Sequence, residues 1–151
     1  MARDISNSDD VIDSRDVIKR IDELTSERDD LQEAIDDAQQ ATPQDEHAID
    51  AQRAAREALA DWNDDYAEEL AALVALQEQA GYSEDWQHGA TLIRESYFED
   101  YAQQLAEDIG AIDPKKSYGW PLDCIDWEQA ARELQQDYTS VEYDGITYWV
   151  R

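Results

Sequence analysis

The sequence predicts an α+β protein that is mainly helical, with a long antiparallel helical hairpin followed by a small helix–helix–β-hairpin domain. Two long stretches with helical periodicity, 14–40 and 43–80, indicate the hairpin. An Asp144-Gly145 turn signal between two short apolar-rich runs indicates the β-hairpin. The predicted organisation is a flexible N-terminus (1–13), a coiled-coil helical hairpin (14–81) and a small α+β domain (82–151).

The first helix is predicted from Ser14 to about Gln40. Its apolar residues recur at alternating steps of four and three, which is the heptad pattern of a coiled coil. Arg28 alone interrupts this seam. The apolar seam residues are Val17, Ile21, Leu24, Leu31, Ile35 and Ala38.

The second helix is predicted from Pro43 to Ala80, with Thr42 as its N-cap and Gly81 as its C-terminal stop. At about 1.5 Å per residue the two helices would be roughly 40 and 55 Å long, and the short connection between them favours an antiparallel hairpin. The apolar stripe of the second helix is Ala48, Ala51, Ala55, Leu59, Trp62, Tyr66, Leu70, Leu73 and Ala80.

The remainder of the chain predicts two short helices and a β-hairpin. The apolar pattern over 96–109 predicts one helix, ended by Gly110. Asp126 followed by Gln129 is a capping box for a second short helix. A two-residue turn at Asp144-Gly145 would place Val141 opposite Tyr148, and we expect this face to pack on the two short helices.

Charge is the dominant compositional feature. The chain carries 38 acidic and 12 basic residues, a formal net charge of −26. Many chains this acidic are disordered, but 42% hydrophobic residues and five Trp are enough to build a core. Binding to nucleic acid or to an anionic membrane needs basic patches. The charge therefore excludes direct binding to either and favours a partner with a basic surface.

The acids are concentrated on the predicted helices without compensating bases. Eight acids and no Lys or Arg lie between Asp29 and Gln52, and nine more lie between Glu57 and Ile93. Like charges three or four residues apart on a helix repel by roughly 0.2–0.5 kcal/mol per pair. We expect the partner-binding surface to consist of Asp29, Asp30, Glu33, Asp36, Asp37, Asp61, Asp64, Asp65, Glu68, Glu69, Glu99, Asp100, Glu107 and Asp108.

A rigid acidic hairpin suits a substitute for DNA. Duplex DNA carries about one negative charge per 1.7 Å of axis, and carboxylates on neighbouring helical turns approach the density of a phosphate row. A solvated helix face, adaptation to high salt or selection for solubility would give the same composition.

No motif indicates catalysis or metal binding. His47 and His88 are isolated in the sequence, and Cys124 follows Asp123, whose charge disfavours a reactive thiolate. We predict a protein that is not an enzyme and that uses no cofactor and no metal. The first residues lack the features of a signal peptide, and no stretch approaches the roughly 20 apolar residues of a membrane span. We therefore expect the protein in the cytoplasm of a bacterial host cell.

Four C-terminal segments carry a resemblance to a known family. Residues 95–111, 125–134, 137–139 and 144–148 resemble antirestriction proteins of the ArdA type. The resemblance implies an acidic, elongated DNA mimic from a phage or another mobile element. Such a protein occupies the DNA groove of a type I restriction–modification enzyme and commonly dimerises. The resemblance covers roughly the final third of the chain, and the N-terminal coiled-coil part does not match.

These observations predict a non-enzymatic inhibitor, phage- or plasmid-encoded, that mimics DNA. Its partner would be a DNA-binding complex with a basic groove, either a restriction–modification enzyme or a CRISPR effector. The homodimer implied by the resemblance stays open. The alternative is a coiled-coil scaffold or adaptor whose seam binds a partner helix and whose acidity serves solubility.

Overall fold

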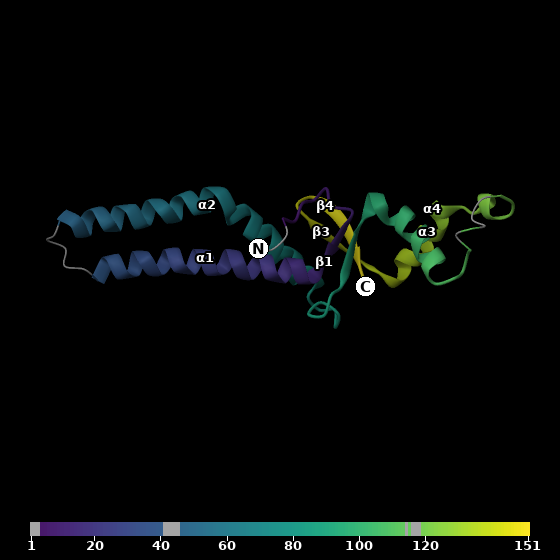
Figure 1. Ribbon diagram of the computed structural model, residues 1–151, viewed down its shortest axis with the longest axis horizontal. Coiled ribbons are helices and arrows are strands. Elements are labelled where there is room, and N and C mark those ends of the chain that lie inside the picture. The colour runs from purple at the N-terminus through teal and green to yellow at the C-terminus, as the bar shows by residue number, and fades with distance from the viewer. Residues whose placement is uncertain (1–3, 41–45, 114, 116–118) are drawn as a thin grey trace.

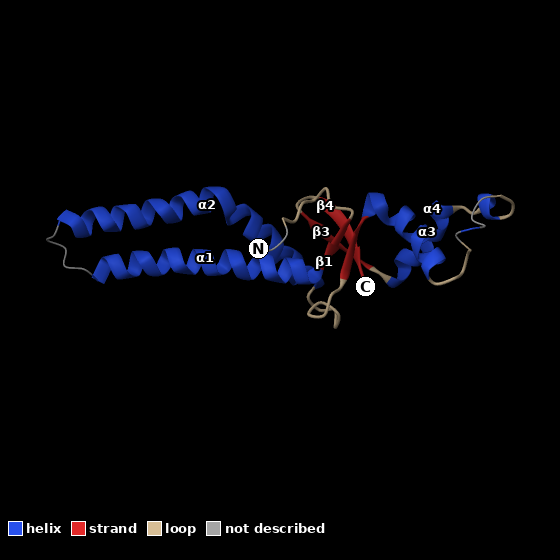
Figure 2. Ribbon diagram, viewed as in Figure 1, coloured by secondary structure: helices blue, strands red, loops and turns tan. Residues whose placement is uncertain are grey.

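The computed structural model describes residues 4–40, 46–113, 115 and 119–151. Two long helices extend from one side of a four-stranded sheet, and two short helices lie on its other side (Figures 1 and 2). The predicted fold class is confirmed. The helices are α1 (Ser14–Gln40), α2 (Glu46–Ala80), α3 (Phe98–Asp108) and α4 (Trp127–Leu134); the strands are β1 (Val11–Asp13), β2 (Thr91–Arg94), β3 (Thr139–Tyr143) and β4 (Ile146–Val150).

The helices begin and end close to the positions that the sequence predicts. Helix α1 has the predicted bounds, and α2 ends at Ala80 as expected. The predicted cap at Thr42 and Pro43 lies outside the described residues. A Cβ added at Gly81 would lie 2.5 Å from the carbonyl oxygen of Gln77. The chain therefore needs glycine where it leaves α2.

The heptad seam of α1 packs against α2 within the same chain. Val17, Leu24 and Ile35 are buried, whereas Arg28 is exposed. The side-chain amide of Gln52 donates a hydrogen bond to the carbonyl oxygen of Ala38 at 3.0 Å. Contacts such as this one fix the antiparallel pairing of the two helices.

The sheet has the strand order β1-β2-β4-β3, and every neighbouring pair is antiparallel. The β3–β4 hairpin has the predicted register, with Val141 opposite Tyr148. Asp144 and Gly145 have φ angles of 49° and 79°, which are the positive values that a type I′ turn requires.

The prediction of a flexible N-terminus is wrong for the described part of residues 1–13. Val11–Asp13 is strand β1 and pairs with β2, with Val11 opposite Ile93. The Arg94 guanidinium also donates to the carbonyl oxygen of Asn7 at 2.9 Å. The hydrogen-bonding partners come from about 80 residues away in the sequence, so local composition gives no sign of them.

The two faces of the sheet pack on different helices. Tyr148 and Val150 face the base of the α1–α2 hairpin and belong to the larger core. Trp149 packs on the opposite face with Phe98 of α3 and Ala131 of α4. The prediction that the Val141–Tyr148 face packs on the short helices is therefore wrong, because the larger apolar surface of the long helices takes that face. The larger core contains residues from both sides of residue 81, where the sequence predicts the boundary between the hairpin and the small domain.

Strand β3 lies at the edge of the sheet, and α2 covers part of that edge. The Gln79 side-chain amide donates to the carbonyl oxygen of Glu142 at 3.0 Å and accepts a hydrogen bond from the Glu142 amide at 2.9 Å. One side chain thus takes the place of a neighbouring strand.

Ser14 lies at the junction of β1, α1 and the loop before β2, and it is fully buried. Its hydroxyl donates to the carbonyl oxygen of Trp86 and accepts from the amide of Ala90, both at 2.7 Å. Its own amide donates to the carbonyl oxygen of Ala90 at 2.9 Å. These bonds join the start of α1 to the loop that follows α2.

Two buried tyrosines hold the N-terminal segment against the sheet. The Tyr148 hydroxyl donates to the carbonyl oxygen of Asp9 at 2.6 Å, and the Tyr143 hydroxyl donates to that of Ile5 at 3.2 Å. Burial raises the pKa of each phenol to about 12. For Tyr143, the nearby negative charges of Glu69 and Asp144 raise the pKa further.

Replacing Ser14 by Ala is expected to lower the free energy of unfolding by about 2–4 kcal/mol, because two buried polar groups lose their partner. Urea denaturation followed by circular dichroism measures the loss. The matched control is Ser26→Ala, at an exposed position of the same helix, with an expected change below about 0.5 kcal/mol. Equal losses in the two variants would contradict the role of Ser14.

The tyrosine pKa values predict an alkaline loss of stability. The unfolded chain releases the phenol protons near pH 10, whereas the folded chain keeps them to about pH 12. Over that interval the unfolded state binds fewer protons, so stability falls as pH rises. In Tyr143→Phe the urea midpoint should fall less between pH 8 and 11 than it does in the parent protein, because one of the raised phenol pKa values is removed. In Tyr82→Phe, at a residue that is 64% exposed, the loss should match that of the parent; the reverse order would refute the assignment.

Candidate functional site

The candidate site is the acidic surface, which divides into three groups by helix. The α1 group is Asp29, Asp30, Glu33, Asp36 and Asp37; the α2 group is Asp61, Asp64, Asp65, Glu68 and Glu69; the α3 group is Glu99, Asp100, Glu107 and Asp108. Glu69 and Glu107 are half-buried, and the other twelve acids are exposed. The structure therefore presents most of the predicted surface to solvent.

The α1 group lies on the outer half of the hairpin, away from the sheet (Figure 1). Asp29, Glu33 and Asp37 follow one another at steps of four residues, which places them on one side of the helix. The hydrogen bond from Gln52 to the carbonyl oxygen of Ala38 places the start of α2 beside this group. That part of α2 carries Arg53, so bases are not absent from the outer half.

The α2 group lies nearer the sheet. Asp61, Asp65 and Glu69 are spaced four residues apart. The indole nitrogen of Trp62 donates to the Glu27 carboxylate at 3.1 Å, which places this group beside the first half of α1. The α1 and α2 groups are consequently staggered along the hairpin and do not lie directly side by side.

Glu69 has a structural role that the sequence does not indicate. The Arg20 guanidinium donates to the two carboxylate oxygens of Glu69 at 2.7 and 3.2 Å, and it lies 3.5 Å from the Glu23 carboxylate. The Glu69 carboxylate raises the pKa of Arg20 above its ordinary value. Glu69 therefore joins α2 to α1, and its charge is partly neutralised within the chain.

The α3 group lies on the other side of the sheet from the hairpin (Figure 1). Glu99 and Asp100 are in the first turn of α3, where acids are favourable to the helix dipole. Asp108 is at the last residue and accepts a hydrogen bond from the Gln104 amide at 3.0 Å. The fourteen acids thus do not form one patch; they are distributed along an elongated molecule.

The fold adds an acid that we did not assign to the surface from the sequence. Asp144, at the β3–β4 turn, lines a recess together with Asp65, Glu68 and Glu69 of α2. Residues 5–7 form another wall, and the Asn7 side-chain amide donates to the carbonyl oxygen of Asp144 at 3.2 Å. The sequence shows Asp144 only as a turn residue, so nothing local indicates this juxtaposition.

Charge density can be compared with that of DNA. Helices α1 and α2 together carry eighteen acids and six bases. Spread over the roughly 52 Å of the longer helix, the net charge is about one per 4 Å. A single DNA strand carries one phosphate charge per roughly 3.4 Å. The hairpin therefore approaches the charge density of one strand and not that of a duplex.

The described residues also limit the chemistry that can be assigned. Among them, no group of three or more His, Cys, Asp or Glu side chains is placed to hold a metal ion. Cys124 is exposed and its thiol lies 3.7 Å from the Asp123 carboxylate. Within the same described part of the chain, none of the helices combines the length and the apolar character needed to cross a membrane.

No protein-family model, no curated protein and no solved structure matches the chain. The resemblance of the C-terminal segments to ArdA-type proteins therefore stays a prediction, and the acidic surface is the feature on which a function has to be argued.

Proposed function

We propose that the chain is a non-enzymatic inhibitor that binds the DNA-binding groove of a bacterial defence complex in place of DNA. The partner is a type I restriction–modification enzyme or a CRISPR effector, and the gene belongs to a phage or plasmid. The inhibitor acts in the cytoplasm of the bacterial host cell. It binds the partner protein and not nucleic acid or membrane, because its own surface is strongly acidic.

The observation that carries this proposal is the exposure of twelve acids on a stiff helical frame. A partner groove lined by Lys and Arg would meet rows of carboxylates held by helices. Complementary charge also speeds association with such a groove.

The placement of the charges argues against a purely structural role. Asp36 and Asp37 lie in the last turn of α1, and Glu107 and Asp108 lie in the last turn of α3. Acids at these ends interact unfavourably with the helix dipole. Neither last turn carries a basic residue. The acids thus reduce helix stability, which is consistent with their being retained for binding.

The scaffold alternative requires a free heptad seam. In this chain the seam residues Val17 and Leu24 are buried in one core with residues of α2, and Ile35 is buried as well. A partner helix could reach them only after the hairpin opened. The seam therefore does not support the scaffold function, although solubility remains an alternative reason for the acidity.

A DNA-displacement experiment tests the proposal directly. The full chain is immobilised, and purified type I restriction enzyme or CRISPR effector complex is bound at low salt. Duplex DNA should release the bound complex, and a DNA-cleavage assay should show inhibition by the free chain. Binding should also weaken steeply as salt increases. Retention of the complex in the presence of excess DNA, with little effect of salt, would contradict mimicry.

The contribution of the acids is expected to be graded. A single charge reversal should change inhibition little, because one exposed pair contributes only about 0.2–1 kcal/mol. Neutralising Asp61, Asp64, Asp65 and Glu68 together should weaken inhibition by about tenfold or more, by the same estimate. Inhibition constants from titrated cleavage assays measure the effect.

The matched control neutralises Glu84, Asp113, Asp123 and Glu133, which are exposed acids outside the three groups. It has the same net charge as the test variant and should inhibit nearly as well as the parent. Equal weakening in both variants would indicate that total charge and not the acidic surface matters. Complete loss from one Asp→Lys substitution would indicate a localised site.

A further inference from the structure

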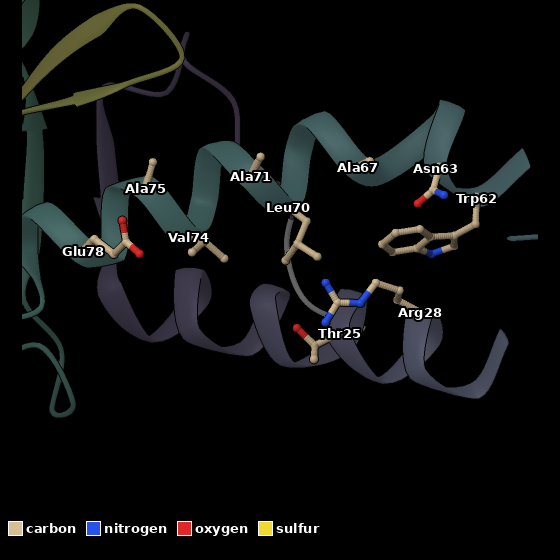
Figure 3. Close-up of a pocket in the computed structure, with 10 residues that line it drawn as sticks. All are labelled: Thr25, Arg28, Trp62, Asn63, Ala67, Leu70, Ala71, Val74, Ala75 and Glu78. Atoms are coloured by element: carbon tan, nitrogen blue, oxygen red, sulfur yellow. The ribbon is translucent and has the colours of Figure 1, made fainter. Parts of the chain in front are cut away.

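A groove runs along one flank of the α1–α2 hairpin, beside the seam (Figure 3). Trp62, Leu70 and Val74 of α2 project toward α1, and Thr25 and Arg28 rise from α1 opposite them. The groove has a volume of about 430 Å³. A second hollow continues it past Val74 and Glu78 toward Ile21 and Trp86. The two together form one long depression between the helices.

The α2 side of the groove is mainly apolar, whereas the exposed surface of a soluble helix is usually polar. Val74 is 38% exposed, and Ala67, Ala71 and Ala75 line the same groove at steps of four residues. A two-helix hairpin buries a single seam, so each flank is left without a third helix. Small residues there let another helix approach closely, at the roughly 8–10 Å interaxial distance of packed helices.

The dimensions suit a single helix. From Trp62 to Glu78 the groove follows seventeen residues of α2, which span about 24 Å at 1.5 Å per step. An amphipathic helix of about five turns would cover this length. A helix docked there would complete a three-helix bundle, with its apolar stripe on Leu70 and Val74.

The charged residues around the groove indicate the kind of helix that it would bind. Asp64 directly follows Asn63, so it lies at the outer edge of the groove wall. Glu78 lines the groove itself. Arg28 also lines it, but its guanidinium lies 3.7 Å from the Asp29 carboxylate, which partly compensates the charge. The surroundings are therefore acidic.

We propose that this flank groove, lined by Trp62, Leu70 and Val74 and edged by Asp64 and Glu78, binds one amphipathic helix with basic flanks from a partner protein. The apolar stripe of that helix covers the groove, and its Lys or Arg residues meet the acids at the edge. A second copy of this chain is disfavoured as the occupant, because each copy carries a net charge of −26. The proposal does not depend on DNA mimicry.

The test measures peptide binding to the full chain without any defence complex. The probe is a labelled synthetic peptide of about 18 residues, with Leu at heptad a and d positions and Lys on the flanking positions. One comparison peptide has the same composition in scrambled order, and another has Glu in place of Lys. Fluorescence anisotropy at about 0.15 M salt should show micromolar binding of the probe and at least tenfold weaker binding of both comparisons.

Matched double variants locate the site. Ala67→Gln with Ala71→Gln fills the groove and should weaken binding of the probe at least about tenfold. Ala54→Gln with Ala58→Gln makes the same change at two exposed positions of α2 outside the groove. It should leave the dissociation constant within about twofold of the parent value. Circular dichroism checks that all variants keep their helix content.

A charge variant keeps the test independent of groove packing. Asp64→Asn with Glu78→Gln removes two charges at exposed positions and should weaken probe binding about threefold or more. Equal binding of the scrambled or the Glu peptide would overturn the proposal, and so would unchanged binding to the Ala67→Gln, Ala71→Gln variant or no binding at all. If sedimentation showed a parent dimer that this variant converts to a monomer, the occupant would be a second copy and the proposal would be wrong.

Discussion

The packing of the hairpin base on one face of the sheet is the contact on which the rest of the structure depends. In chain order, β1 leads directly into α1, and β2 follows α2 after a short loop. The pairing of β1 with β2 therefore closes the hairpin at its base. Leu73 and Leu76 are fully buried there with Tyr148. The helical hairpin is thus an insertion between two paired strands and not a separate coiled coil attached to a domain.

This arrangement reconciles a large negative charge with a stable fold. The apolar residues are used in two cores, one on each face of the sheet. The acids are left on the outer surfaces of the helices, where water and salt screen their repulsion. The half-buried carboxylate of Glu69 is paired with the Arg20 guanidinium. The charge is therefore concentrated on surfaces that are exposed to solvent.

The α1 and α2 groups of the acidic surface and the flank groove are different features of the same hairpin. The first is a set of exposed carboxylates that would act through long-range attraction. The second is an apolar depression that would act through contact and shape. Both follow from a two-helix architecture, because two helices can bury one seam and must leave the remaining faces in solvent. Asp64 belongs to the acidic surface and also edges the groove.

The sequence by itself determined the helices, the β-hairpin and the identity of the exposed acids. Periodicity, Gly81 and the Asp144-Gly145 turn are local signals, and local signals act through the backbone of neighbouring residues. Only the tertiary structure decided that Val11–Asp13 is a strand, that Tyr148 faces the long helices, and that Asp144 joins the acids of α2. Each of these depends on a partner far away in the chain. The residues near a segment do not show which distant segment it will pair with or pack against, so a local pattern cannot predict such a contact.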